Sequence, residues 1–376
     1  MKTLLLLIFW SLWFLNFSCR AVLSPLLPII EEELALTHAM AGSFFLLISV
    51  GYTISLILAG LVSPRLGYKR AIVASFFFVS IVLFSLRLAE SYRSLAVLML
   101  LVGIGTGIYL PSIVPMITAI FDRQKWGRVI ALHDSGASFS IFAVPALVAV
   151  ALRFFYWRTL FLILGGACLV GLTFFWLFSP DPHVQKEESP RFLNILGRRD
   201  FWVMGILWSF AAAASMGVYN VVPLFLVKER GIPLELANTI FGVSRVGGLF
   251  VPLAGFLADR YGAKRLLLLI VLTTGIATTG LAWARDFNLL VMMLILQATA
   301  ATAFFPVGLL SISKLTDVRE RSTFIGATIA FGVTMGGFTP LVLGAVADVW
   351  NFQIGILILG ILIICSSASL KGLKEV

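Results

Sequence analysis

Twelve apolar stretches, each long enough to cross a lipid bilayer, place the strongest constraint on how this chain can fold. A hydrocarbon core of roughly 30 Å takes about 20 helical residues to cross. A transmembrane β-barrel would instead show alternating segments of about ten residues. The sequence therefore predicts an all-α integral membrane protein with twelve transmembrane helices. The predicted spans are residues 3–28, 38–62, 70–88, 94–119, 128–151, 157–179, 200–226, 236–258, 265–284, 288–313, 322–346 and 350–370.

The composition agrees with this class. Hydrophobic residues make up 60% of the chain and charged residues 12%, which is too apolar for a water-soluble domain with a charged surface.

The first span begins like a secretory signal, but its apolar region continues through Trp13 to Pro28, and a signal has only about 7 to 15 apolar residues. We therefore interpret it as a retained helix. Cys19, Cys168 and Cys365 all lie in predicted spans, which argues against a disulfide framework.

The chain repeats itself at an offset of 195 residues. The charged segment from Gly60 to Arg70 returns as the segment from Gly255 to Arg265, and the same offset relates Pro28 to Pro223. It also relates Pro111 to Pro306 and Pro145 to Pro340. We predict two pseudo-symmetric six-helix bundles, residues 1–179 and 200–376, joined by a polar, proline-containing cytoplasmic linker, residues 180–199. Duplicated membrane halves are typical of transporters.

Basic residues predict how the chain is oriented. With the amino terminus in the cytoplasm, 19 of the 28 Lys and Arg residues fall in cytoplasmic segments and 7 in outer segments. The positive-inside rule then places both termini in the cytoplasm. We expect a multi-pass protein of the inner (cytoplasmic) membrane. This bias toward anionic membrane lipid also accounts for the net charge of +10, so no nucleic-acid partner is needed.

The repeated charged loop resembles the signature loop of the major facilitator superfamily, and the resemblance covers the whole chain. Three further segments are similar to those of that family. They are Trp126-Gly127-Arg128 at the start of helix 5, Arg319-Glu320-Arg321 at the start of helix 11, and Trp157-Arg158 before helix 6. The resemblance implies a carrier that works by alternating access, with helices 1, 4, 7 and 10 facing the substrate pathway. The signature positions are Gly60, Arg65, Gly67, Lys69 and Arg70, repeated as Gly255, Asp259, Arg260, Gly262, Lys264 and Arg265.

Only three charged residues are predicted well inside spans: Arg20, Asp134 and Arg245. A buried charge costs at least about 2.5 to 3.5 kcal/mol at the bilayer centre unless it faces a cavity or a partner. At 1.5 Å per residue, both arginines lie roughly 20 to 25 Å from the inner face, in opposite halves. Two guanidiniums facing one cavity would suit a carboxylate or phosphate, as in the organic-anion and organophosphate carriers that the chain resembles. The alternative is that they pair with Asp134 or with helix carbonyls.

His133 and Asp134 form the one titratable pair in the spans. A histidine changes charge near neutral pH, which suits coupling to a proton or control of a gate. Consecutive helical residues point about 100° apart, so both cannot face one cavity squarely. The alternative for His133 is a buried, hydrogen-bonded structural residue. A coupled proton or a counter-anion is therefore an expected partner.

Polar residues beside helix-bending prolines are further candidates for binding substrate. A proline in a span frees backbone carbonyls that a cavity can satisfy. The glycines of helices 4 and 11 are expected to permit close helix packing. The three histidines, at positions 38, 133 and 183, are scattered, so we expect no metal or other cofactor, and no catalytic set. The candidate lining residues are Asn16, Tyr109, Tyr219, Asn220 and Gln297.

These observations favour a secondary active transporter that moves a small organic anion by alternating access. Because no nucleophile and base occur together in the sequence, we expect that the protein is not an enzyme. A drug/proton antiporter is the second interpretation, but helix 4 lacks the arginine that such exporters carry. A transporter-like anion receptor is the third. A monomer is expected for this architecture.

The two signature loops are predicted to contribute unequally to gating. The resemblance implies that Asp259 meets the positive amino end of helix 5 near Arg128, whereas Pro64 occupies the equivalent position in the first copy. Asp259→Asn should therefore shift the conformational equilibrium more than Pro64→Ala. Accessibility labelling of the two variants measures this shift, and equal effects would contradict the prediction.

Overall fold

The computed structural model describes residues 2–181, 196–250, 254, 257–258, 260–316 and 318–373. These residues form helices and no strand, so the predicted all-α class is confirmed. Eleven helices in this part of the chain are long and apolar enough to cross a membrane. The remaining predicted span, residues 236–258, includes residues outside the described ranges.

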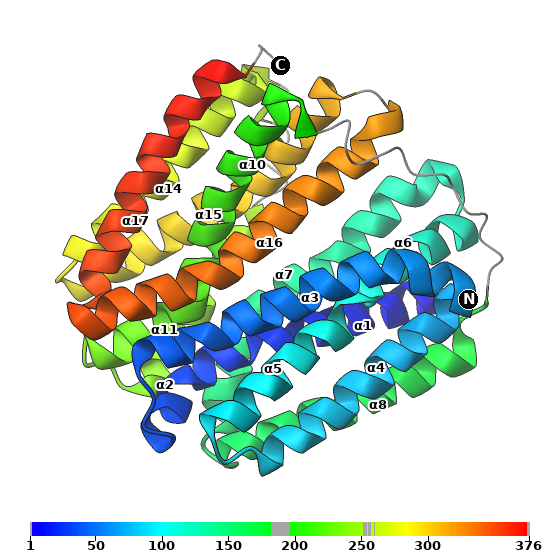
Figure 1. The fold of residues 1–376 in the computed structure, drawn as a ribbon, viewed down its shortest axis with the longest axis horizontal. Coiled ribbons are helices and arrows are strands. Elements are labelled where there is room, and N and C mark those ends of the chain that lie inside the picture. Colours follow the sequence, from blue (N-terminus) through cyan, green and yellow to red (C-terminus); the bar gives the residue numbers. More distant parts are fainter. Residues whose placement is uncertain are drawn as a thin grey trace. The chain divides into compact units, whose positions relative to one another are not determined.

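The first six predicted spans correspond to eight helices, because two spans are divided (Figure 1). The first span is interrupted at Val22 and the fourth at Ile108. The helices are α1 (Lys2–Ala21), α2 (Leu23–Glu33), α3 (His38–Leu66), α4 (Tyr68–Ser85), α5 (Tyr92–Gly107), α6 (Tyr109–Ile120), α7 (Trp126–Ala151) and α8 (Trp157–Phe178).

The second repeat shares the division of its first span, whereas its second span is interrupted as well and its fourth span is a continuous helix. A π-helical turn, η3 (Ala213–Gly217), separates α10 (Arg199–Ala212) from α11 (Val218–Lys228). A 3-10 turn, η4 (Arg245–Phe250), follows α12 (Leu234–Ser244). The other helices are α14 (Ala263–Trp283), α15 (Phe287–Leu315), α16 (Val318–Val349) and α17 (Phe352–Ser366), followed by η5 (Ser367–Gly372).

The described residues belong to two compact units. The first contains those of Met1–Leu36, Leu47–Glu187 and Leu234–Thr239, and the second those of Thr37–Leu46, Glu188–Pro233 and Ile240–Val376. Equivalent helices pack together in each unit: α4 contacts α5 and α8 in the first, as α14 contacts α15 and α17 in the second (Figure 1). Likewise α1 contacts α7, as α10 contacts α16. The bundle limits at residues 179 and 200 stay a prediction, and linker residues 182–195 lie outside the described ranges.

Each unit also holds the first turns of a helix that continues in the other. In the second unit, the Asp348 carboxylate accepts hydrogen bonds from the backbone N–H groups of His38 (2.7 Å) and Ala39 (2.9 Å), where α3 begins. In the first unit, Arg153 forms an ion pair with Glu235 near the start of α12. Arg153 and Asp348 are 195 residues apart, so the repeat places an anchoring charge at equivalent positions. A carboxylate at a helix amino end is favourable because it meets unpaired N–H groups and the positive end of the helix dipole.

The signature loops turn in the same way in both repeats. Gly67 and Gly262 have φ of 88° and 87°, a left-handed conformation that glycine adopts without steric cost. Two residues later, Lys69 Nζ donates to the carbonyl of Ser179 (2.6 Å), and Lys264 Nζ donates to that of Leu373 (2.5 Å). Each lysine thus binds a carbonyl beyond the last helix of its repeat. This contact gives the loop a structural role in addition to the predicted one at the lipid surface.

Glycines allow α3 and α5 to approach closely. A methyl group added at Gly103 would lie 2.1 Å from the Ile48 carbonyl oxygen, and one at Gly51 would lie 2.2 Å from that of Leu100. By contrast, a methyl group at Gly166 in α8 would have no atom within 4 Å. The expectation that glycines of helix 4 serve close packing therefore agrees with the geometry at Gly103.

Alanine substitutions at these two glycines should have opposite effects. Gly103→Ala should destabilise the fold by roughly 1–3 kcal/mol, because two backbones must separate. Gly166→Ala should raise stability by up to about 1 kcal/mol, because alanine favours helix and the site is open. Thermal unfolding of the detergent-solubilised variants measures both signs. A Gly103→Ala variant as stable as the parent would rule out the tight contact.

Candidate functional site

The divided helices lie at the candidate site residues. Arg20 is the penultimate residue of α1, Tyr109 begins α6, and Arg245 begins η4. Tyr219 is the second residue after the π-helical turn, which ends at Gly217. Such interruptions leave backbone groups for side chains or ligands to satisfy, and π-turns are frequent at functional sites. The sequence pointed to these places through prolines, but most interruptions lie several residues before the proline.

Arg20 is held by aromatic rings of the first unit. Its guanidinium carbon lies 4.3 Å from the Phe17 ring centroid and 4.4 Å from that of Tyr52 in α3. Its Nε and Nη2 atoms are buried and have no hydrogen-bond partner among the described residues. These two nitrogens form one edge of the guanidinium fork, which matches the two oxygens of a carboxylate. The sequence did not point to Tyr52, because an aromatic residue in an apolar span carries no distinguishing signal.

Asn16 lies one turn before Arg20 on α1 and is buried at 2% exposure. Its Nδ2 donates to the backbone carbonyl of Thr106 (3.0 Å), close to the α5–α6 interruption. Its Oδ1 has no partner in the part of the chain that the structure describes. The side chain thus fixes an interrupted helix with its amide nitrogen and keeps an acceptor oxygen for another group.

Tyr109 and His133 are part of a buried aromatic stack with Trp13. The Trp13 ring lies parallel to both, with centroid distances of 5.5 Å to Tyr109 and 5.6 Å to His133. The Tyr109 hydroxyl donates to the carbonyl of Phe9 (2.9 Å) and lies 3.2 Å from His133 Nε2. His133 is only 1% exposed. These contacts favour the structural interpretation of His133.

Asp134 has a different environment from its neighbour. It is exposed, and its Oδ1 accepts a hydrogen bond from the Trp13 indole N–H (3.1 Å). The structure therefore separates the titratable pair as the 100° helical rotation requires, with His133 buried and Asp134 accessible.

Arg245 has a similar aromatic setting in the second unit. Its guanidinium carbon lies 4.6 Å from the Tyr219 ring centroid and 5.7 Å from that of Phe241. The residue is 7% exposed, and its Nε has no partner among the described residues. Cation–π contacts are worth about 2 kcal/mol or more when water is excluded, but they involve the face of the guanidinium and leave the Nε–H donor unsatisfied.

Gln297 and Asn220 complete the predicted residues of the second unit. Gln297 in α15 is buried, and its Nε2 donates to the carbonyl of Ala214 (2.7 Å) inside the π-helical turn. It thus satisfies one of the interrupted helix's backbone groups, as Asn16 does in the first unit. Asn220 is half-buried in α11, next to Tyr219.

Most signature-loop residues lie at helix ends. Gly60 and Arg65 are in α3, and Arg260 lies two residues before Gly262. Gly255 and Asp259 lie outside the described residues, so the structure does not address the predicted Asp259 contact. The arginines of the two signature loops are all exposed: Arg65, Arg70, Arg260 and Arg265.

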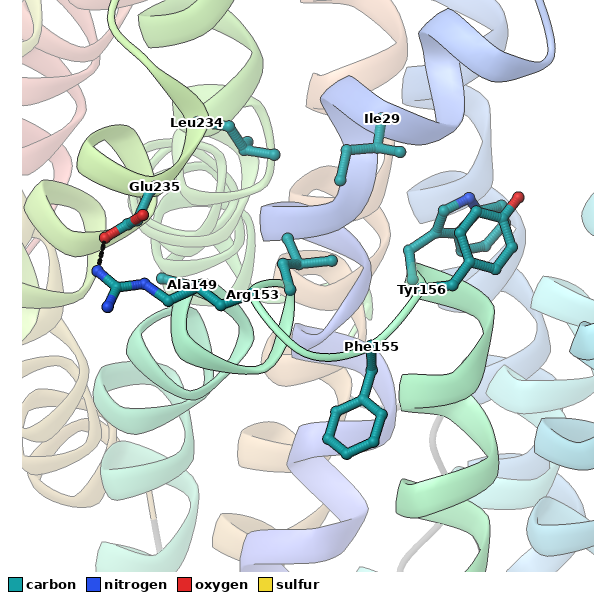
Figure 2. Close-up of a pocket in the computed structure, with 9 residues that line it drawn as sticks. Ile29, Ala149, Arg153, Phe155, Tyr156, Leu234 and Glu235 are labelled. Atoms are coloured by element: carbon teal, nitrogen blue, oxygen red, sulfur yellow. Dashed lines mark hydrogen bonds and ion pairs between the residues drawn. The ribbon is translucent and has the colours of Figure 1, made fainter.

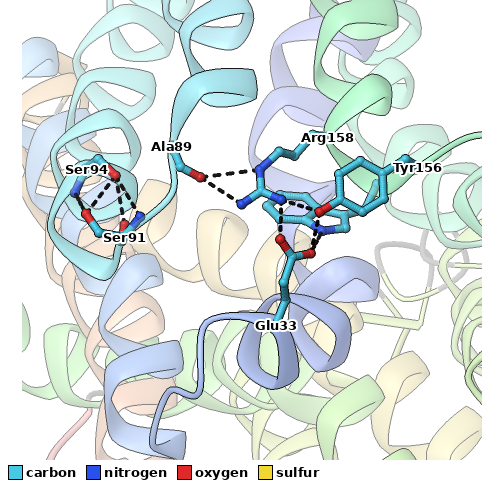
Figure 3. A network of polar contacts seen from close by, with 7 residues as sticks. Glu33, Ala89, Ser91, Ser94, Tyr156 and Arg158 are labelled. Atoms are coloured by element: carbon cyan, nitrogen blue, oxygen red, sulfur yellow. Dashed lines mark hydrogen bonds and ion pairs between the residues drawn. The ribbon is translucent and has the colours of Figure 1, made fainter.

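A second polar group joins α2, α8 and the segment after α4 (Figure 3). Glu33 accepts hydrogen bonds from the Tyr156 hydroxyl (2.5 Å), the Trp157 indole (2.5 Å) and Arg158. Arg158 Nη2 also donates to the Ala89 carbonyl (2.9 Å). The sequence marked the Trp157-Arg158 step but not Glu33. Because the ion pair is saturated with hydrogen bonds, we interpret it as a structural anchor.

A cavity of about 450 Å³ lies beside this anchor in the first unit. Ile29, Phe155 and Leu234 contribute apolar walls, and Arg153 reaches across to Glu235 (Figure 2). The hydrogen bond from Arg153 holds the pKa of Glu235 below its ordinary value. No predicted site residue lines this cavity.

The comparisons with known proteins identify the fold and the family. The structure of a bacterial homolog of the human lysosomal transporter Spinster, in an inward-facing and occupied conformation, superposes with a TM-score of 0.82 at 15% sequence identity. The match covers 98% of this chain and 96% of the other. At this identity the likeness concerns the fold.

Two curated relatives are similar in sequence. The hexuronate transporter of Bacillus subtilis (strain 168) is 26% identical over 65% of this chain, and the match spans 61% of that transporter's length. The 3-(3-hydroxy-phenyl)propionate transporter of Escherichia coli (strain K12) is 21% identical over 87% of this chain and 83% of its own length. Both names are those of transporters, in agreement with the prediction that the chain is not an enzyme.

The family comparison covers both repeats. The model of the Major Facilitator Superfamily matches residues 9–251 and again residues 234–372. Because these matches span nearly the whole sequence, the chain belongs to the Major Facilitator Superfamily of transporters.

Proposed function

We propose that this protein is a secondary active transporter that carries a small organic anion by alternating access, and that Arg20 and Arg245 each bind the anionic group. The observation that carries the proposal is the guanidinium edge of Arg20. Its Nε and Nη2 atoms are buried without a partner among the described residues. Such a donor pair binds a carboxylate or a phosphate with two parallel hydrogen bonds.

The structural alternative has less support at Arg20. Asp134, the one carboxylate predicted well inside a span, accepts a hydrogen bond from Trp13. The rings of Phe17 and Tyr52 give Arg20 partial compensation and leave its fork edge unused. A buried charge retained at this cost favours a ligand role. The names of the two relatives, a hexuronate and a hydroxyphenylpropionate transporter, denote carboxylate substrates and support the same class.

A drug/proton antiporter is the second candidate. The observation in its favour is the number of aromatic rings around both arginines, which include Phe17, Tyr52, Tyr219 and Phe241. Apolar cations would bind such rings, but two buried guanidiniums would repel them. The anion carrier is therefore the better explanation of the charges.

The proposed membrane arrangement follows from the distribution of basic residues. We place the protein in the inner membrane as a monomer, with both termini and the linker in the cytoplasm. Membrane lipid contacts the exposed apolar side chains, which include Phe77, Ile81 and Val170.

Variants of Arg20 test the anion site. Arg20→Lys keeps the charge but loses the fork, so counterflow of a labelled carboxylate should fall roughly tenfold, and Arg20→Ala should lower it about a hundredfold. The measurement is counterflow in proteoliposomes against a panel of organic anions. Arg285→Ala, at an exposed arginine between the ninth and tenth spans, is the matched control.

Two results would contradict this proposal. Undiminished anion counterflow in Arg20→Ala would remove the arginine from the site. Transport of cationic drugs by the parent protein, with no exchange of any anion, would favour the drug antiporter instead.

We further propose that Asp134 carries the coupled proton and that His133 supports the helix packing around it. Asp134 is accessible and oriented by the Trp13 indole. Trp13 belongs to α1, the helix that also carries Arg20. Protonation of Asp134 removes a negative charge near the site, which strengthens binding of the anion. A counter-anion exchanged for substrate is the alternative source of coupling.

Proton coupling predicts different outcomes for two transport assays. Asp134→Asn mimics the protonated carboxyl, so uptake driven by a pH gradient should be lost while counterflow at equal pH is retained. His133→Gln should reduce folded yield more than coupling, because the side chain is buried. The measurement is uptake with and without an imposed pH gradient. Gradient-driven uptake that survives in Asp134→Asn would contradict the assignment and favour exchange against a counter-anion.

A further inference from the structure

Asn16 and Arg20 together present both hydrogen-bonding polarities on one face of α1. They are four residues apart, and residues at this spacing lie on the same side of a helix. Arg20 offers two N–H donors, at Nε and Nη2, and Asn16 offers one acceptor, Oδ1. All three atoms are buried and lack a partner among the described residues. A buried polar group without a partner is costly, so a ligand that supplies the missing partners is favoured.

The amide of Asn16 can turn only one way. Its other end faces the Thr106 carbonyl at 3.0 Å, and only the NH₂ group can donate to a carbonyl. The remaining atom is therefore an oxygen, which accepts hydrogen bonds and cannot donate them. A ligand group beside Asn16 must consequently be a donor.

Neighbouring residues place a second hydroxyl-binding group at the same level. Ser55 of α3 lies against α5. A methyl group added at Gly107, the residue that follows Thr106, would be 2.7 Å from Cβ of this serine. Its Oγ is also buried and lacks a partner within the described ranges. Tyr52, one turn earlier on α3, lies against Arg20. The buried polar groups thus extend from the guanidinium of Arg20 toward Asn16 and Ser55.

We infer that the substrate is a 2-hydroxy carboxylate, or a longer acid with a hydroxyl at that position. This inference rests on the proposed anion-carrier function. The carboxylate accepts from Nε and Nη2 of Arg20, and the adjoining hydroxyl donates to Oδ1 of Asn16. The two interactions require a substrate that is an acceptor at one end and a donor at the next carbon.

The same geometry disfavours two related classes of acid. A 2-oxo acid would bring its carbonyl oxygen against the Asn16 oxygen, so that two acceptors meet without a proton between them. An acid with no substituent at this carbon would leave Oδ1 buried and unpaired. A site with a hydrogen-bonding group for a substrate hydroxyl rejects analogues that lack it, because its own polar atom is then unsatisfied.

Two sets of acids that differ only at carbon 2 test this inference. The aromatic set is mandelate (both enantiomers), phenylglyoxylate and phenylacetate. The sugar-acid set is gluconate and 2-oxogluconate. Each acid is used in proteoliposomes to drive exchange by the wild-type protein. The hydroxy acid of a set should exchange at least about tenfold better than its oxo or unsubstituted partner.

Variants then locate the source of the preference. Asn16→Leu keeps the branched shape of the side chain but has no acceptor, so it should lose the tenfold preference while it still exchanges the acids. Ser55→Ala should reduce the preference only partly. Thr279→Val, which removes another buried hydroxyl without a described partner in the second unit, should keep the preference in full.

The outcomes separate the inference from the function on which it rests. Equal exchange of hydroxy and oxo acids by the wild-type protein would overturn the inference and leave the anion carrier intact. A preference that persists in Asn16→Leu would overturn the role of Asn16. If neither set is exchanged and no other organic anion is, the proposed function itself fails. The wild-type comparison needs no variant, so poor folding of Asn16→Leu would not prevent a decision.

Discussion

The cost of keeping a charge inside an apolar helix bundle governs the rest of this structure. Arg20 and Arg245 sit in divided spans, each against aromatic rings, and each keeps at least one donor without a described partner. Ring contacts stabilise the face of a guanidinium, but they leave its buried N–H donors without hydrogen bonds, and each such donor carries a cost of its own. The polar partners that would satisfy these donors are therefore expected from a ligand, and this is why the functional proposal begins at these residues.

Backbone hydrogen bonding imposes the second constraint. In an apolar surrounding every N–H and C=O group must find a partner, so an interrupted helix needs compensation from a neighbouring side chain. Asn16 supplies it to Thr106 in the first unit, and Gln297 supplies it to Ala214 in the second. These amides are thus structural and functional at once. At Asn16 the structural bond also fixes which atom remains for substrate, so packing and specificity come from one side chain.

Sequence reasoning could find the helices because length and hydropathy alone determine which segments suit a bilayer. It could find the arginines because a charge within an apolar span stands out against its neighbours. It could not find Tyr52 or Ser55, because such residues are common in spans and become distinctive only through what they contact. It also could not choose between the two roles offered for His133 and Asp134. Their different exposure, and the stack of His133 with Trp13, come from the packing of α1 on α7.

The sequence by itself determined the membrane class, the repeat at 195 residues, and the glycines and lysines that shape both signature loops, because each depends on local composition or on backbone conformation. Only the tertiary structure decided which residues meet. Cys19 and Cys168, 149 residues apart, have their sulfur atoms 3.6 Å from each other, and Asn16 reaches a carbonyl 90 residues away. Such pairings depend on the rotation and depth at which helices pack. Side chains from the whole length of both partners set these quantities together, so no single segment encodes them.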